Sequence, residues 1–246
     1  MSDPASAGLD ACALAQLTTA LNRWIATGHI AGAVVLVERR GVLGLFDAIG
    51  QQDASRGVAM RRDSIFRIYS MTKPIVSVAL MQLAEQGRVL LREPVAKYLP
   101  VVGVDGAAPK RAPTVHDLLR HTAGLTYEFH EPSAVRQRYA DAKLYSRQRT
   151  NAQHVELLAG LPLMHEPGSV WDYSRATDVL GRLVEVLADA PLAEYLRAAI
   201  FEPLGMVDTG FAVPPEAMFA LILTQAPGLL DDVRELFRQG VYAAIE

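Results

Sequence analysis

The sequence predicts a mixed α/β (α+β) fold, in which an N-terminal sheet is followed by a long helical region. Two observations predict it. β-branched runs typical of strands lie almost entirely in the first 70 residues. Beyond them, apolar residues recur at helical spacing in several separate stripes. With 246 residues, half of them apolar, the chain can bury the core of one large domain or two interleaved ones.

The first 70 residues carry one predicted helix and three predicted strands. Apolar residues at helical spacing predict an amphipathic helix over residues 10–27. The β-branched run 33–37 and the run 42–49 predict two strands of a hairpin. A third short strand is expected over residues 64–69, leading directly into Ser70.

Helical patterns dominate the rest of the chain. Pro74 is tolerated in the first turn of a helix, where backbone N–H groups have no intrahelical partner. The first of these helices is therefore expected to begin close to Ser70. The helices predicted from apolar stripes and capping signals cover residues 72–86, 115–121, 176–188, 191–202 and 229–246.

The chain is expected to form one domain, residues 1–246, with three parts. Residues 1–70 supply the N-terminal helix and strands, residues 71–205 a helical region, and residues 206–246 a partial C-terminal segment. Two or three strands make a poor sheet by themselves, so the sheet is expected to be incomplete on its C-terminal side.

Composition excludes several functional classes. The net charge of -3 gives no basic excess of the kind that indicates nucleic-acid binding. Cys12 is the single cysteine, which excludes internal disulfides and cysteine-based zinc sites. The N-terminus does not resemble a secretory signal, and no apolar run is long enough for a membrane span. A cytoplasmic protein is therefore expected, or a periplasmic one if a leader was removed.

The segment from Ser70 to Lys73 is the sharpest chemical signal. Residues three positions apart share a helical face, so the Lys73 ammonium can reach the Ser70 hydroxyl. A serine alcohol is a weak nucleophile and needs a neighbouring base. Near the positive end of a helix and partly buried, Lys73 tends to lose its proton and can be that base. The alternative is a helix-capping serine beside a solvated lysine.

Tyr173 is the second candidate. It lies between the Glu166–Gly168 turn and a predicted helix, so its hydroxyl can point into a cleft and relay protons to and from Ser70. We expect this hydroxyl roughly 3–5 Å from Ser70 or Lys73. On residue chemistry alone, a tyrosine that belongs to the core or the surface is the more common outcome.

Other polar residues are weaker candidates. His116 and His121 do not share a helical face, so a metal pair is not expected. His121 is expected to satisfy nearby backbone groups instead. The carboxylates of Glu166 and Asp172 are expected to be solvated loop carboxylates.

Five segments, in order, carry a family resemblance: Phe66–Pro74, Asp117–Leu125, Glu166–Ser174, Asp178–Glu185 and Pro203–Met206. They resemble the class C β-lactamases, the D-alanyl-D-alanine carboxypeptidases and the related esterases of the penicillin-binding-protein superfamily, and the esterase branch most closely. The resemblance implies a β-lactamase-like fold, with an antiparallel sheet flanked by helices and an interleaved helical region. It also implies that Ser70 is the acylated nucleophile, Lys73 its partner base, and Tyr173 the tyrosine of the family's Tyr-x-Asn motif.

The chain departs from the family pattern in two places. Arg175 stands where the family has asparagine, which disfavours recognition of β-lactam amides. No Lys, His or Trp follows Tyr173, so the family's late Lys-Thr-Gly, His-x-Gly or Trp-x-Gly motif is absent. The chain therefore resembles a C-terminally truncated member. An unpaired sheet edge and a missing oxyanion donor are expected to leave such a chain poorly stable and weakly active.

The leading interpretation is a serine hydrolase that acts on small carboxylic esters or amides through an acyl-enzyme on Ser70. It implies a small-molecule substrate and neither a metal nor an organic cofactor. Two alternatives stay open. One is a β-lactamase or D-Ala-D-Ala carboxypeptidase, and the other is a truncated, non-catalytic relative that at most binds acyl compounds.

Overall fold

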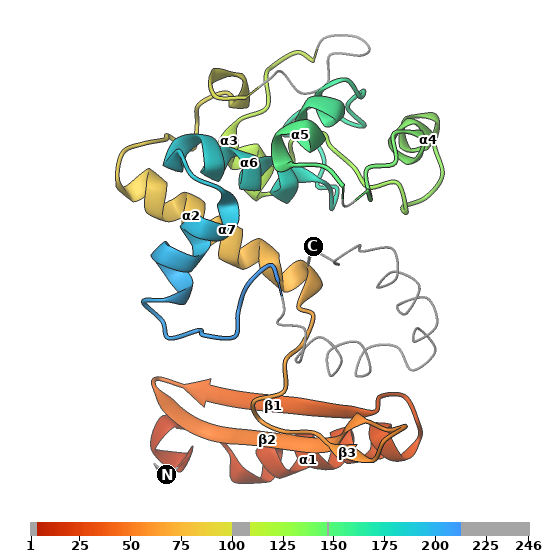
Figure 1. The fold of residues 1–246 in the computed structure, drawn as a ribbon, viewed down its shortest axis with the longest axis vertical. Helices are drawn as coiled ribbons and strands as arrows, with labels where there is room; N and C mark the ends of the chain where they lie inside the picture. Colours follow the sequence, from red (N-terminus) through yellow and green to blue (C-terminus); the bar gives the residue numbers. More distant parts are fainter. Residues whose placement is uncertain (1–3, 100–108, 147, 213–246) are drawn as a thin grey trace. The chain divides into compact units, whose positions relative to one another are not determined.

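The chain packs as two compact units in the computed structural model, which describes residues 4–99, 109–146 and 148–212 (Figure 1). We call described residues 4–68 the sheet unit and residues 69–211 the helical unit, since the contacts divide the chain there.

The sheet unit is an α-helix packed on an antiparallel sheet. The strands pair in the order β1-β2-β3, and α1 packs against β2 (Figure 1). The predicted helix over residues 10–27 and the predicted hairpin strands over 33–37 and 42–49 are confirmed. In chain order the elements are η1 (Pro4–Ala7), α1 (Ala11–Ala26), β1 (Gly32–Arg39), β2 (Val42–Asp53) and β3 (Val58–Ala59).

Local sequence signals explain where these elements begin and turn. The Asp10 side chain caps α1 by accepting a hydrogen bond from the main-chain N–H of Cys12 at 2.8 Å. Arg40 and Gly41 join β1 to β2 with φ angles of 56° and 74°. Positive φ at both positions is typical of the type I′ hairpin turn, so this pair sets the sharp reversal of the chain.

The predicted strand over residues 64–69 is wrong. The Ser64 hydroxyl accepts a hydrogen bond from the N–H of Arg61 and donates one to Gln52 Oε1, which closes a turn. At the other end, Tyr69 has a φ of 43°, in the left-handed region that lies outside the β region. These local features break the extended run at both ends, and the short strand β3 pairs with β2 instead.

The helical unit is organised around an apolar core between α2 and α6. Leu80, Leu83, Leu180 and Leu183 are each at most 1% exposed. Burial of this kind is the dominant favourable contribution to folding. In chain order the elements are η2 (Tyr69–Met71), α2 (Thr72–Glu85), η3 (Val95–Lys97), α3 (Val115–Leu119), α4 (Ala134–Asp141), α5 (Asn151–Ala159), α6 (Ala176–Ala188), α7 (Leu192–Leu196) and η4 (Arg197–Phe201).

Most of the predicted helices of this unit are present. Those over residues 72–86, 115–121 and 176–188 are confirmed to within two residues at their ends. The helix predicted over 191–202 is divided into α7 and the π-helical segment η4. The helix predicted over 229–246 lies outside the described residues.

Two short helices, α4 and α5, have no counterpart in the prediction. Ser133 and Thr150 cap them by accepting hydrogen bonds from the main-chain N–H groups of Arg136 and Gln153. None of the helices in the described ranges has the length and apolar character that a membrane crossing requires.

Asp117 anchors the start of α3 and is 4% exposed. It accepts two hydrogen bonds from the Arg111 guanidinium at 2.7 and 2.9 Å. Further donors are the N–H of Thr114 at 2.9 Å and the hydroxyl of Thr122 at 3.0 Å. Burial opposes the ionised form of Asp117, but these donors outweigh it and hold the pKa of the carboxyl well below its usual range.

We expect Asp117→Asn to lower the free energy of unfolding by about 2 kcal/mol. This is less than for a fully buried ion pair, because the Arg111 side chain is 46% exposed. The measurement is urea unfolding followed by Trp171 fluorescence in a Trp24→Phe background, with Asp141→Asn as the surface control.

The same experiment gives a pH dependence with a defined sign. A carboxyl with a lowered folded-state pKa stabilises the fold above its unfolded pKa, and that contribution is lost as pH falls through the folded pKa. The difference between the parent chain and Asp117→Asn should therefore shrink below about pH 4. A difference that stays constant to the acid limit would contradict this assignment.

Candidate active site

Ser70 and Lys73 lie at the N-terminal end of α2. Ser70 is the middle residue of the 3-10 turn η2, which runs directly into α2, and Lys73 lies in the first turn of that helix. The left-handed residue Tyr69 turns the chain into the helix. Lys73 Nζ lies 3.3 Å from Ser70 Oγ, so the predicted contact between the two side chains is confirmed.

Tyr173 reaches the same point from the loop that precedes α6. Its hydroxyl donates a hydrogen bond to Ser70 Oγ at 2.7 Å, closer than the sequence led us to expect. Lys73 Nζ lies 4.7 Å from the ring centroid of Tyr173 and 5.8 Å from that of Tyr127. The lysine is therefore within cation–π range of two aromatic rings while it contacts Ser70.

The surroundings of Tyr173 favour its ionised form. Burial of the phenol raises the pKa of Tyr173, but hydrogen bonds with Lys73 and Ser70 outweigh burial, so the pKa lies below the ordinary value. The charge of Lys73 acts in the same direction, and that of Asp178 acts weakly against it. A lowered pKa increases the fraction of phenolate at a given pH, and the phenolate is the form of Tyr173 that can accept a proton.

His121 satisfies local backbone groups, as the sequence suggests. Its Nδ1 accepts a hydrogen bond from the main-chain N–H of Ser174 at 3.2 Å, so this nitrogen carries no proton. Burial lowers the pKa of His121, and the nearby charge of Lys73 lowers it further. The neutral ring packs against Tyr173, with the ring centroids 5.0 Å apart.

Main-chain hydrogen bonds hold the Tyr173 loop against the segment that follows α3. The N–H groups of Met164, Gly168 and Asp172 donate to the carbonyls of Gly124, Thr122 and His121, at 2.7, 2.7 and 3.0 Å. Gly124 has a φ of +84°, and a Cβ at that position would lie 2.2 Å from the carbonyl oxygen of His165. Glycine is therefore required where the two segments meet.

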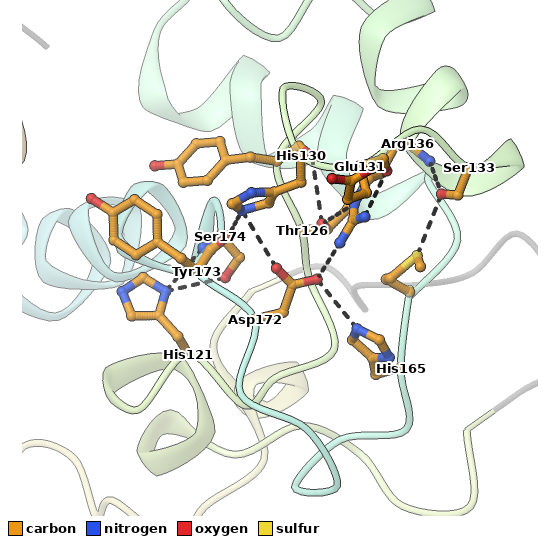
Figure 2. A network of polar contacts seen from close by, with 12 residues as sticks. His121, Thr126, His130, Glu131, Ser133, Arg136, His165, Asp172, Tyr173 and Ser174 are labelled. Atoms are coloured by element: carbon orange, nitrogen blue, oxygen red, sulfur yellow. Dashed lines mark hydrogen bonds and ion pairs between the residues drawn. The ribbon is translucent and has the colours of Figure 1, made fainter.

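Asp172 is not the solvated carboxylate that the sequence suggests, because it is only 7% exposed. Its Oδ2 lies 3.2 Å from Arg136 Nη2 and 3.2 Å from His165 Nε2 (Figure 2). Its Oδ1 lies 3.5 Å from His130 Nε2. Glu166, by contrast, is exposed as expected. Charged and polar groups from two other segments therefore compensate the negative charge of the buried Asp172 carboxylate.

Arg175 occupies the position of the family's asparagine. It is 8% exposed and forms an ion pair with Glu128. Its Nη1 lies 3.6 Å from Asp178 Oδ2, and its guanidinium lies 4.8 Å from the centroid of the Tyr127 ring. Two carboxylates and an aromatic face hold this arginine, so its charge is already matched within the protein.

The sequence analysis missed four residues around the site: Tyr127, Glu128, His130 and Arg136. The available signal was the run Thr126–His130, which is rich in aromatic and histidine side chains and directly follows the Asp117–Leu125 segment. Arg136 gave no local signal, because it contacts Asp172 from a different part of the chain.

The polar groups that meet at Asp172 do not form a metal site. Within the ranges that the structure describes, no group of three or more His, Cys, Asp or Glu side chains is arranged to hold a metal ion. The charge of Asp172 is already matched at Oδ2 by Arg136, which is permanently cationic.

Known proteins match most of this chain. The family model described as Beta-lactamase matches residues 14–232. Esterase EstB of Burkholderia gladioli is 37% identical over 225 residues, which are 89% of this chain and 57% of EstB. Lovastatin esterase of Penicillium rubens is 30% identical over 211 residues, which are 79% of this chain and 52% of that protein.

A solved structure shows the same fold. EstCE1, described as a hydrolase with promiscuous acyltransferase activity, is similar with a TM-score of 0.74 and 32% identity, covering 83% of this chain and 55% of EstCE1. The chain thus spans about half the length of the relatives it matches.

These matches confirm the expected β-lactamase-like α/β fold, an antiparallel sheet flanked by helices. Since the family model covers well over half of the sequence, the chain belongs to the beta-lactamase family, within the superfamily of serine β-lactamases and penicillin-binding proteins.

Proposed function

We propose that the chain is a serine hydrolase that cleaves small carboxylic esters, or amides, through an acyl-enzyme on Ser70. The observation that carries the proposal is the convergence of Lys73 and Tyr173 on Ser70 Oγ, at 3.3 and 2.7 Å. Serine needs an adjacent base to become a nucleophile. Similarity to two proteins named as esterases and to a hydrolase supports the same chemistry.

The lowered pKa of Tyr173 and its shorter contact with Ser70 Oγ favour Tyr173 as the group that accepts the Ser70 proton. Both the Tyr173 hydroxyl and the Lys73 ammonium donate toward Ser70 Oγ. When Tyr173 ionises, its contact with Ser70 reverses and Ser70 becomes the donor. Lys73 then holds the phenolate by charge, a supporting role in place of the base role that the resemblance implies.

Acylation follows from this arrangement. Ser70 Oγ passes its proton to the Tyr173 phenolate and attacks the carbonyl carbon of the ester. The tetrahedral intermediate collapses as the carbonyl–alkoxy bond breaks, and the departing alkoxide takes the proton from Tyr173 and leaves as an alcohol.

Deacylation repeats these steps with water. Tyr173, again ionised, accepts a proton from the attacking water and returns it to Ser70 Oγ as the acid departs. The sum is ester plus water giving acid plus alcohol.

Two features of the site favour apolar esters over β-lactams. Position 175 carries an arginine, which is paired with Glu128, in place of the asparagine whose amide the family uses. Trp171 and Phe129 are 66% and 67% exposed, and their rings stack on Tyr173 and Tyr127. Exposed rings beside the nucleophile suit an apolar acyl or alkoxy group.

The test of the proposed function is covalent labelling with a fluorophosphonate probe, read by intact mass and peptide mapping. We expect a single adduct on Ser70 and none in Ser70→Ala. Ser77→Ala, about two helical turns further along the chain in α2, is the matched control and should label like the parent chain. Labelling of another residue, or none at all, would remove the nucleophile assignment.

Tyr173→Phe should slow hydrolysis of p-nitrophenyl butyrate by about 10²–10⁴-fold, the usual contribution of general acid–base catalysis. The exposed Tyr145 provides a control substitution, Tyr145→Phe, expected to have no effect. In the parent chain the rate should fall as pH drops through the pKa of Tyr173, which lies below about 10. That limb of the profile should be absent from Tyr173→Phe, and an unchanged profile would contradict the proton-transfer role.

We also expect a higher specificity constant for p-nitrophenyl butyrate than for the cephalosporin nitrocefin. The reason is the Arg175–Glu128 pair, which leaves no amide group to receive a β-lactam side chain. Steady-state kinetics with both substrates decides the ranking. A clear preference for nitrocefin would favour the β-lactamase alternative.

A further inference from the structure

Two histidines hold the main chain on both sides of Tyr173. His121 accepts hydrogen bonds from the N–H of Asp172 through its carbonyl, at 3.0 Å, and from the N–H of Ser174 through Nδ1, at 3.2 Å. His130 Nε2 contacts the carbonyl oxygen of Tyr173 itself at 2.7 Å (Figure 2). Three consecutive residues thus each have a main-chain group held by a histidine.

The surroundings of His130 fix its protonation at Nε2. Both neighbours of this nitrogen are acceptors, the Tyr173 carbonyl at 2.7 Å and Asp172 Oδ1 at 3.5 Å. A ring nitrogen between two acceptors must carry a proton. His130 is therefore the donor to the Tyr173 carbonyl, and the buried Asp172 carboxylate makes that tautomer the favoured one.

Asp172 is itself fixed from the opposite side. Arg136 and His165 both contact its Oδ2 at 3.2 Å, which leaves Oδ1 facing His130. In Figure 2 the Asp172 carboxylate points toward Arg136 and His165, while the Tyr173 ring points away from them. The Asp172 carboxylate therefore does not touch the reacting atoms, and it affects the position of Tyr173 only through the loop.

We propose that His130, oriented by Asp172, is a positioning residue that sets the Tyr173 hydroxyl against Ser70. This inference rests on the proposed function, because it assigns the placement of the group that transfers the proton. The hydrogen bond at the Tyr173 carbonyl fixes the peptide plane and with it the direction of the side chain. Proton transfer needs heavy-atom distances of about 2.6–3.2 Å, so a small rotation of the loop breaks the contact with Ser70.

A pair of His130 variants separates positioning from folding. His130→Phe keeps a ring of similar size but has no donor, whereas His130→Gln places an amide N–H near the position of Nε2. We expect His130→Phe to lower kcat for p-nitrophenyl butyrate about 10- to 100-fold with little change in KM. His130→Gln should recover most of that loss. His116→Phe, on an exposed position of α3, is the control and should match the parent chain.

A second readout does not depend on turnover. The ultraviolet absorbance of ionised tyrosine, taken as the difference between each chain and its Tyr173→Phe counterpart, reports the pKa of Tyr173 directly. Loss of the contacts with Ser70 and Lys73 should move this pKa up toward about 10 in His130→Phe, and His130→Gln should restore it. If His130→Phe does not fold, His130→Asn, which is polar but too short to reach the carbonyl, takes its place.

The outcomes distinguish this inference from the proposed function. If Ser70→Ala and Tyr173→Phe behave as expected but His130→Phe has the rate and Tyr173 pKa of the control, the inference is wrong and the proposed function stands. A slow His130→Phe with an unchanged Tyr173 pKa also overturns it. If Ser70 does not label, the proposed function fails, and the absorbance titration still decides whether His130 places Tyr173.

Discussion

The main-chain pairing between residues 121–124 and 164–172 is the constraint on which the site depends. Ser70 and Lys73 share one helix end, so their contact needs little beyond the start of α2. Tyr173 lies 103 positions from Ser70 in the chain, and only tertiary structure can bring the two hydroxyls to 2.7 Å. Each main-chain hydrogen bond contributes about 1 kcal/mol, so several of them acting together are needed to hold a loop in one place.

Three arginine–carboxylate pairs reinforce the loops around the site: Arg111 with Asp117, Arg136 with Asp172 and Arg175 with Glu128. Such pairs contribute little net stability when both ions lose water, but breaking one is costly. Arginine suits this work because its planar, forked donors fix the partner's orientation as well as its charge. The pairs therefore favour a single arrangement of the loops that they join.

The sequence predicted what depends on local periodicity and on short spacings. The stripes of α1, α2 and α6 were sufficient to place these helices, and the Ser70–Lys73 spacing was sufficient to place that contact. The strand expected over 64–69 failed because side-chain hydrogen bonds of Ser64 and the backbone of Tyr69 overrode an extended pattern.

The partners of Tyr173 and Asp172 could not be predicted from the sequence, for a different reason. The contact of His130 with the Tyr173 carbonyl, and that of Arg136 with Asp172, join positions 43 and 36 apart. No periodicity links such residues, and the burial that gives Asp172 its role is a property of the folded chain. The family resemblance supplied Tyr173 but gave no role to His130 or Arg136.

The division between the two units falls between Ile68 and Tyr69, just before the proposed nucleophile Ser70. Ser70, Lys73 and Tyr173 all belong to residues 69–211, together with the histidines and arginines that support them. All the residues that the proposed function assigns to serine activation therefore lie within one unit. Substitutions within residues 4–68 can accumulate without touching the contacts of Ser70 with Lys73 and Tyr173, so the two units are free to diverge at separate rates.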